Sequence, residues 1–159
     1  MEQFVLDESG VRYFRYAAID ARKVRASAWH LCGELQRHFS HSSYADSGLA
    51  FESQDEGARV MCLVKTPFSE ARLVLDWIRG DQGIDGKLVA ERKRLGEDDR
   101  PLWQPVYSIV VPSNEENPYV EVGDSRRHLY IHQGSDEQHF LSIRNVGMSI
   151  YAGVLGGSR

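Results

Sequence analysis

The stretch ARKVRASAWHLCGELQRHF, residues 21–39, sets the frame of the fold because its apolar residues recur at helical spacing. The positions that share one side are Val24, Ala28, Leu31, Leu35 and Phe39. Polar and charged residues occupy the opposite side, and Asp20 stands where a helix N-cap is expected. This pattern predicts a helix over residues 21–38 that buries one face.

Extended segments are predicted on both sides of this helix. Residues 11–20, VRYFRYAAID, are rich in aromatic and β-branched residues, as strands are. After the helix, GLAFES (48–53) and ARVMCLVK (58–65) have the composition of two strands joined by the turn QDEG. The first strand, the helix and this pair would begin an α+β domain.

A second helix is predicted over residues 67–79, within TPFSEARLVLDWIRG. Thr66 suits an N-cap, Pro67 suits the first helical position, and Gly80 suits a C-terminal stop. The expected buried face of this helix consists of Ala71, Val74, Leu75 and Ile78.

The last part of the chain reads mainly as short strands. Residues 87–95 favour helix by composition but are followed by a turn, and we interpret them as a strand. The further predicted strands are 102–111, 118–122, 128–133 and 139–144, and a short helix is predicted after residue 144.

These elements predict one α+β domain over residues 1–159, with an antiparallel sheet and two main helices on one face. The order over residues 11–95 is βαββαβ, which is the ferredoxin-like arrangement, and additional antiparallel strands continue to the C-terminus. The expected core between helices and sheet consists of Val24, Leu31, Leu35, Val60, Cys62, Val64, Val74, Leu75 and Ile78.

Bulk composition is ordinary for a globular chain, with 42% hydrophobic and 26% charged residues among 159. The net charge of −4 gives no overall attraction to nucleic acid or to anionic lipid. The start, MEQFVLDESG, has acidic residues where a signal peptide needs basic ones, and no apolar run is long enough to span a membrane. A soluble, cytoplasmic protein without membrane contact is the resulting expectation.

Cys32 and Cys62 are the only cysteines, which is too few for a disulfide framework. We expect two reduced and mostly buried thiols, and the sequence leaves a single bridge between them open.

Histidines gather in HLYIHQGSDEQHFLSIR, residues 128–144, which holds three of the six in the chain. Folded as a β-hairpin with GSDE as its loop, this stretch would place His132 opposite His139, with Cβ atoms about 5 Å apart. The pair could share a metal only if a third ligand came from elsewhere. We expect a polar pair without metal or cofactor, and His132 and His139 remain the candidate metal ligands of a metal-dependent hydrolase.

Two charged patterns could mark a functional site or could be ordinary solvated surface. Asp85 with Glu91 and Lys93 resembles the D…E-x-K pattern of metal-dependent nucleases, although so short a pattern is common by chance. The other is the basic stretch of residues 12–37, with Tyr13, Phe14 and Tyr16 interleaved. Its basic residues are Arg12, Arg15, Arg22, Lys23, Arg25 and Arg37, set against Asp20 and Glu34.

Aromatic residues beside arginines on a sheet can stack the bases of single-stranded RNA. The strand expected at residues 58–65 lacks the aromatic signature of such RNA-binding modules, so a charged helix surface is the favoured interpretation.

The chain carries no G-x-S-x-G elbow, P-loop or dinucleotide-binding glycine pattern, so no catalytic residue is predicted. The favoured function is a non-enzymatic protein-interaction module, such as an adaptor, an inhibitor or an immunity-type protein, with an unidentified protein partner. The alternatives are a ferredoxin-like protein that binds or processes single-stranded RNA, and the metal-dependent hydrolase. The candidate binding residues are Arg22, Arg25, Arg37, Trp77 and Trp103. The oligomeric state is left open.

Overall fold

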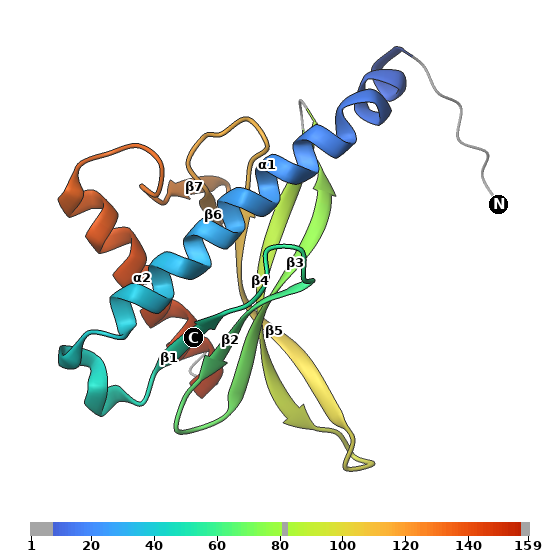
Figure 1. The fold of residues 1–159 in the computed structure, drawn as a ribbon. Helices are drawn as coiled ribbons and strands as arrows, with labels where there is room; N and C mark the ends of the chain where they lie inside the picture. The colour runs from blue at the N-terminus through green and yellow to red at the C-terminus, as the bar shows by residue number, and fades with distance from the viewer. Residues whose placement is uncertain (1–7, 81–82, 157–159) are drawn as a thin grey trace.

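A computed structural model describes residues 8–80 and 83–156, apart from the side chains of Ser9, Arg12 and Tyr13. Within these residues the order is a long helix, seven strands and a second helix (Figure 1). The helical elements are α1 (Glu8–Phe39), the 3₁₀ helix η1 (Ser42–Ser47) and α2 (Asp136–Leu155). The strands are β1 (Ala50–Ser53), β2 (Val60–Lys65), β3 (Glu70–Arg79), β4 (Ile84–Leu95), β5 (Pro101–Val111), β6 (Tyr119–Val122) and β7 (Ser125–His128).

The sheet is an antiparallel meander in which each strand pairs with the next one along the chain. Its middle is formed by the long strands β3, β4 and β5, whereas β5 and β6 share the single pair Val110 and Tyr119. The predicted α+β class with an antiparallel sheet and two main helices is confirmed. The predicted βαββαβ order is wrong, because residues 11–95 form a helix, a 3₁₀ turn and four consecutive strands.

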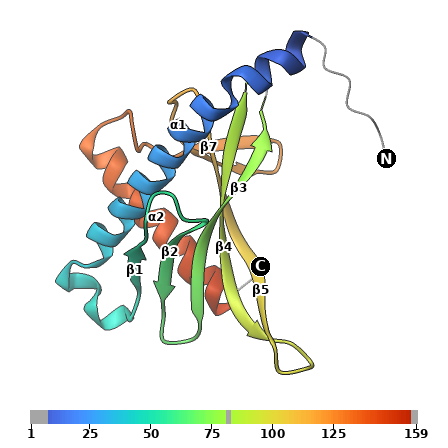
Figure 2. The ribbon, with the colours of Figure 1, turned by 45° about the vertical axis from the view of Figure 1, so that its right-hand side comes forward.

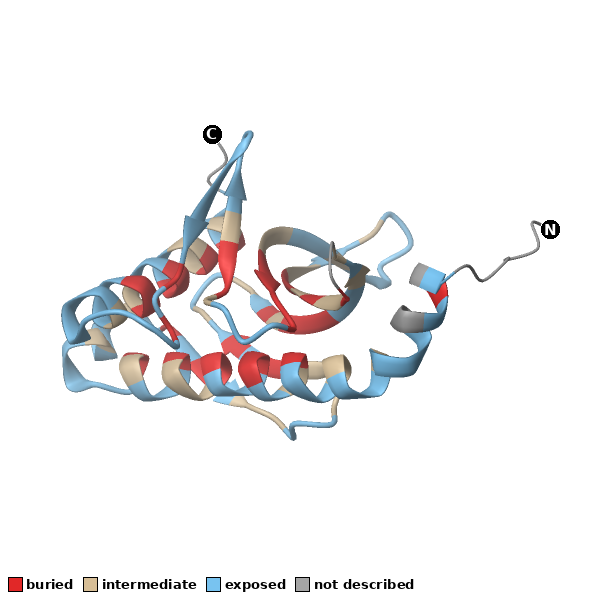
Figure 3. Cartoon of the chain, turned by 90° about the horizontal axis from the view of Figure 1, so that it is seen from above, coloured by how far each residue is buried: buried red, intermediate tan, exposed pale blue. Residues whose placement is uncertain are grey.

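Both helices bury their apolar sides against the same face of the sheet (Figures 1 and 2). Buried residues follow the side of α1 that faces the sheet (Figure 3). The first helix contributes Val24, Ala28, Leu31, Cys32, Leu35 and Phe39. The second helix contributes Ile143, Val146, Ile150 and Val154, which are again spaced by three or four residues.

Six of the nine expected core residues belong to this core: Val24, Leu31, Leu35, Cys62, Val64 and Leu75. Val74 is also buried, but it alternates with Leu73 and Leu75 along β3 and therefore faces the other side of the sheet. Val60 and Ile78 are only half-buried.

Residues 11–20 are helical and not a strand, which corrects the first predicted element. No glycine or proline interrupts the chain between Gly10 and Gly33, so a helix formed over the apolar stripe can extend toward the N-terminus at little cost. Asp20 lies inside α1, where its carboxylate accepts a hydrogen bond from the backbone N–H of Ile84 at 3.1 Å. It ties the helix to the start of β4 and does not act as a cap.

Residues 67–79 form a turn and strand β3, not the predicted helix. Thr66 does accept hydrogen bonds from the backbone N–H groups of Phe68 and Ser69, but these close the turn between β2 and β3. The run ARLVLDWI is apolar on both sides of a strand, and short apolar runs fit a buried strand as well as a helix. Pairing with β2 and β4 decides between the two.

The predicted hairpin over residues 128–144 is wrong. β7 ends at His128, residues 129–135 form a loop, and α2 begins at Asp136. Ser135 is its N-cap: its hydroxyl accepts from the backbone N–H of Gln138, and the Gln138 side chain accepts from the backbone N–H of Ser135. The S-x-x-Q capping box therefore occupies the segment that was interpreted as the hairpin loop.

The helix predicted after residue 144 is confirmed as far as Leu155, but it begins earlier than expected. The strand predictions within 48–65, 87–111 and 118–122 are confirmed by β1, β2, β4, β5 and β6.

Cys32 of α1 and Cys62 of β2 are free, fully buried thiols. The hydrogen bond to Cys62 and, after it, burial raise the pKa of Cys32 well above its ordinary value. We expect neither thiol to react with iodoacetamide in the native protein and both to react in urea, as measured by intact mass. Failure to react in urea without reductant would instead indicate a bridge.

Two helical glycines make a matched pair for testing the packing of α1 against α2. A Cβ at Gly147 would overlap the ring of Phe39, which is held by the rings of Tyr44 and Phe51. A Cβ at Gly33 would meet nothing within 4 Å. We expect Gly147→Ala to lower the free energy of unfolding by about 1–3 kcal/mol.

Gly33→Ala should raise the free energy of unfolding by about 0.5–1 kcal/mol, because alanine has the higher helix propensity. Urea denaturation of both variants measures the difference. Equal changes of the same sign would show that α2 does not rest on Phe39.

Candidate functional site on the exposed side of helix α1

The first turns of α1 extend beyond the sheet (Figures 1 and 2). Large apolar side chains are exposed there: Val11 is 50%, Phe14 81%, Tyr16 45% and Ile19 41% exposed. Phe14, Ala28 and Leu35 are separated by multiples of seven residues and therefore lie on nearly the same side of α1. Ala28 and Leu35 are buried, whereas Phe14 is exposed. The apolar stripe that covers the core thus continues past the sheet into solvent.

The same part of α1 is basic. Residues 11–25 contain Arg12, Arg15, Arg22, Lys23 and Arg25 against Asp20, an excess of four positive charges in a chain whose net charge is −4. The side chains of Arg12 and Tyr13 lie outside the described part of the structure. Positive charge is therefore concentrated on this helix, and the rest of the chain is strongly acidic.

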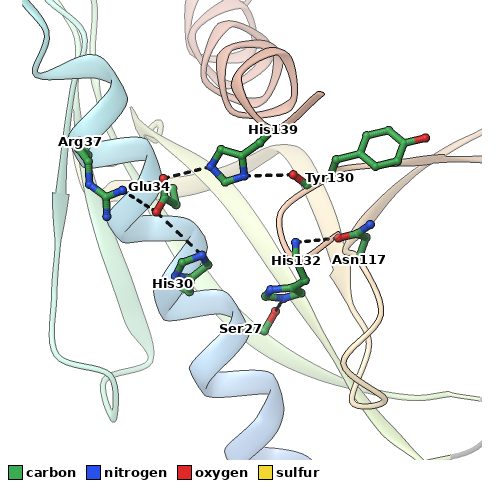
Figure 4. A network of polar contacts seen from close by, with 8 residues as sticks. All are labelled: Ser27, His30, Glu34, Arg37, Asn117, Tyr130, His132 and His139. Carbon is green, nitrogen blue, oxygen red and sulfur yellow. Dashed lines mark hydrogen bonds and ion pairs between the residues drawn. The ribbon is translucent and has the colours of Figure 1, made fainter. Parts of the chain in front are cut away.

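Farther along α1, residues of three elements form a polar cluster (Figure 4). The cluster consists of Ser27, His30, Glu34 and Arg37 of α1, Asn117, Tyr130 and His132 of the loops around β6 and β7, and His139 of α2. We call it the α1 polar cluster. It joins α1 to the loops and to the first turn of α2.

One end of the α1 polar cluster is built on Ser27. Its hydroxyl oxygen lies 2.7 Å from Nε2 of His132, and the His132 ring stacks on His30 with centroids 5.9 Å apart. The side-chain oxygen of Asn117 accepts from the backbone N–H groups of His132 at 2.8 Å and Gln133 at 3.0 Å. These bonds hold the 129–135 loop against the helix.

The other end of the cluster is built on Glu34, whose side chain is 12% exposed. Arg37 donates to one carboxylate oxygen at 2.7 Å, and His139 Nε2 lies 3.2 Å from the other. The second ring nitrogen of His139 lies 3.1 Å from the carbonyl oxygen of Tyr130. Burial by itself would raise the pKa of Glu34, but hydrogen bonds from His139 and Arg37 outweigh it and lower that pKa.

Two histidines near this surface have lowered pKa values. Burial and, after it, nearby His30 lower the pKa of His132, while Glu115 acts in the opposite direction. Burial also lowers the pKa of His38, with smaller contributions from Arg144, His41 and His139.

His132 and His139 do not face each other. They contact α1 at Ser27 and Glu34, which are seven residues, or about 10 Å, apart along the helix. His128 lies in β7 against the ring of Tyr119. Within residues 8–80 and 83–156, no three His, Cys, Asp or Glu side chains converge in a way that could hold a metal ion.

The D…E-x-K residues are also separated by the structure. Asp85 accepts hydrogen bonds from the backbone N–H and hydroxyl of Ser113. Glu91 pairs with Arg72 at 2.9 Å, and Lys93 pairs with Glu70 at 3.1 Å. Asp85 and Glu91 are six residues, or about 20 Å, apart on β4, which is too far to share a metal.

The predicted binding residues divide among four places. Arg25 lies over the ring of Trp77 at 5.2 Å, beside α1. Trp103 lies elsewhere on the sheet, under the guanidinium of Arg72 at 3.9 Å. Arg37 belongs to the α1 polar cluster, and Arg22 lines a separate cavity next to Ser27.

The sequence did not single out Ser27, His30 or Asn117 as site residues. The capping box at Ser135 was the one signal that could have placed His132 in a loop and His139 on a helix.

The Ser27–His132 distance is within the range of a nucleophile and its general base. However, the second ring nitrogen of His132 has no hydrogen-bond partner among the described residues, so the base lacks an orienting group. Ser27 lies inside α1, where backbone N–H groups are bonded within the helix and cannot stabilise an oxyanion. The described residues at this contact thus supply neither the orienting group nor the oxyanion donors that acyl transfer uses.

Comparison with protein-family models gave no match, and comparisons with curated proteins and with solved structures gave no significant similarity. No described helix combines the length and apolar composition that crossing a membrane requires. Geometry and charge are therefore the grounds for inferring a function.

The lowered pKa values of His38 and His132 predict acid sensitivity. Below the ordinary value of 6.5 the unfolded chain binds more protons than the native protein at these sites, so stability falls as the pH drops from about 7 toward 5. The lowered pKa of Glu34 adds stability that is present above the unfolded value of 4.5 and lost at lower pH.

Urea denaturation at several pH values measures this dependence. His132→Gln should flatten the slope of the free energy of unfolding against pH between about pH 7 and 5. If the pH dependence of the free energy of unfolding were unchanged in His132→Gln, the lowered pKa of His132 could not be its cause.

Proposed function

We propose that this protein is a protein-interaction module that presents residues 11–25 of α1 to an acidic partner with an apolar groove. The observation that carries the proposal is Phe14, which is 81% exposed on the basic helical segment that extends beyond the sheet. Aromatic and arginine side chains are the residues that most often anchor protein interfaces.

The spacing of the exposed residues suits a helix that lies in a groove. Val11, Phe14 and Ala18 stand at i, i+3 and i+7, which puts them on one side of the helix. Tyr16 and Ile19 widen the apolar area on the adjacent side. Burial of such side chains contributes about 25 cal/mol per Å² of apolar surface, before the costs of association.

Charge supports an acidic partner. Residues 11–25 combine the exposed apolar side chains with an excess of four positive charges, and a complementary rim on the partner would speed association and fix its orientation. A partner of the opposite charge is also less able to bind the acidic remainder of the chain.

The alternative of single-stranded RNA binding depended on Tyr13, Phe14 and Tyr16 lying on a strand of a ferredoxin-like sheet. These residues are helical, so that argument no longer applies. Fluorescence anisotropy with single-stranded RNA at low salt should show no binding tighter than about 10 µM. Tighter, salt-sensitive binding would favour RNA over a protein partner.

Two exposed phenylalanines allow a matched test of the proposed interaction. Phe14 is 81% exposed on α1, and Phe68 is 60% exposed in the turn between β2 and β3. We expect the wild-type chain and Phe68→Asp to retain one stoichiometric acidic protein from the native host, and Phe14→Asp to lose it. Affinity purification with mass spectrometry measures retention, and reconstitution with the purified partner confirms direct binding.

Both variants should melt at the wild-type temperature, because neither side chain is buried. Equal retention by Phe14→Asp and Phe68→Asp would overturn the proposed surface. If the retained partner had a basic surface, the proposal that the partner is acidic would be wrong.

A further inference from the structure

We propose that the cavity beside Ser27 binds the phosphate group of a small phosphate monoester. The cavity has a volume of ≈ 620 Å³ and lies between α1 and the loops that precede β6 and α2. Arg22 and Lys23 also belong to the segment 11–25 proposed to meet a protein partner, but binding of a small ligand here does not require that interaction.

Residues that carry hydrogen-bond donors line this cavity from two elements. Arg22 and Lys23 come from one turn of α1 and Ser27 from the next, and His132 and Gln133 come from the 129–135 loop. The set contains two cations together with hydroxyl, imidazole and amide groups. Such a mixture suits the several acceptor oxygens and the double charge of a phosphate.

Two of these donors are available to a ligand. The guanidinium of Arg22 makes no hydrogen bond or ion pair within the described part of the chain. The second ring nitrogen of His132 is likewise unpaired there, while Nε2 is bonded to Ser27. A bound phosphate oxygen would give both groups an acceptor.

The loop side of the cavity is already ordered. Asn117 accepts two backbone hydrogen bonds from His132 and Gln133, and the His132 ring is stacked on His30 (Figure 4). Little conformational entropy would therefore be lost there on binding. The volume exceeds that of a phosphate group and falls within the range of small-ligand sites, so the ligand carries an organic body.

One carboxylate also lines the cavity and would compete with the ligand. Glu115 lies 4.0 Å from the ammonium of Lys23, with side chains that are 75% and 44% exposed. An exposed ion pair of this length is weak, so a doubly charged phosphate can displace it. Removing the Glu115 charge should therefore strengthen binding, whereas removing a cation should weaken it.

The test uses the full chain with phenyl phosphate, inorganic phosphate and benzoate as probes, in calorimetry and in NMR of the histidine ring signals. We expect phenyl phosphate to bind more tightly than inorganic phosphate, and benzoate to bind weakly. The ring signals of His132 should shift on binding. Arg22→Gln should weaken phenyl phosphate binding about tenfold, and Glu115→Gln should tighten it several-fold.

Arg100→Gln is the matched control, because Arg100 pairs with Asp98 in the turn between β4 and β5. It should bind phenyl phosphate as the wild type does, and all variants should keep the wild-type melting temperature. Absence of binding at about 10 mM, or equal affinity in Arg22→Gln, would overturn the site. If benzoate bound as tightly as phenyl phosphate, the site would not be specific for phosphate. If inorganic phosphate bound as tightly as phenyl phosphate, the inference that the ligand has an organic part would be wrong.

Discussion

The burial of the α1 apolar stripe on the sheet is the contact on which the rest of the structure depends. Leu31 and Leu35 are fully buried there, and Gly86 leaves the room that Val24 occupies, since a Cβ at that position would overlap it. With 32 residues, α1 is about 48 Å long, and its first turns extend beyond the sheet (Figures 1 and 2). The apolar side of the helix is therefore covered along the sheet and exposed around Phe14.

The same helix organises the polar groups. Ser27 contacts His132 of the 129–135 loop, and Glu34 contacts His139 of α2. The α1 polar cluster is thus a junction between elements that are far apart in the sequence. It orders one wall of the cavity next to Arg22. Helix α1 therefore both packs against the core and contributes to the candidate binding site.

Local patterns predicted much of the fold correctly. The helix over residues 21–38 and strands such as β2 and β5 have one apolar face or a strong β composition, and the structure agrees with them. Residues 67–79 were misassigned because Leu73, Val74 and Leu75 are all buried, which removes the alternation that marks a strand. The hairpin error arose at Ser135, where turn-forming residues also make a capping box.

The sequence by itself determined the α+β class, the apolar stripe of α1 and the concentration of positive charge in its N-terminal half, because these depend on residues close together in the chain. Tertiary structure alone decided that Ser27 meets His132 and that Glu34 meets His139, across 105 positions in each case. Spacing within a segment cannot report such contacts. They arise from the packing of α1 and α2 on one sheet face, which minimises exposed apolar surface for the whole chain at once.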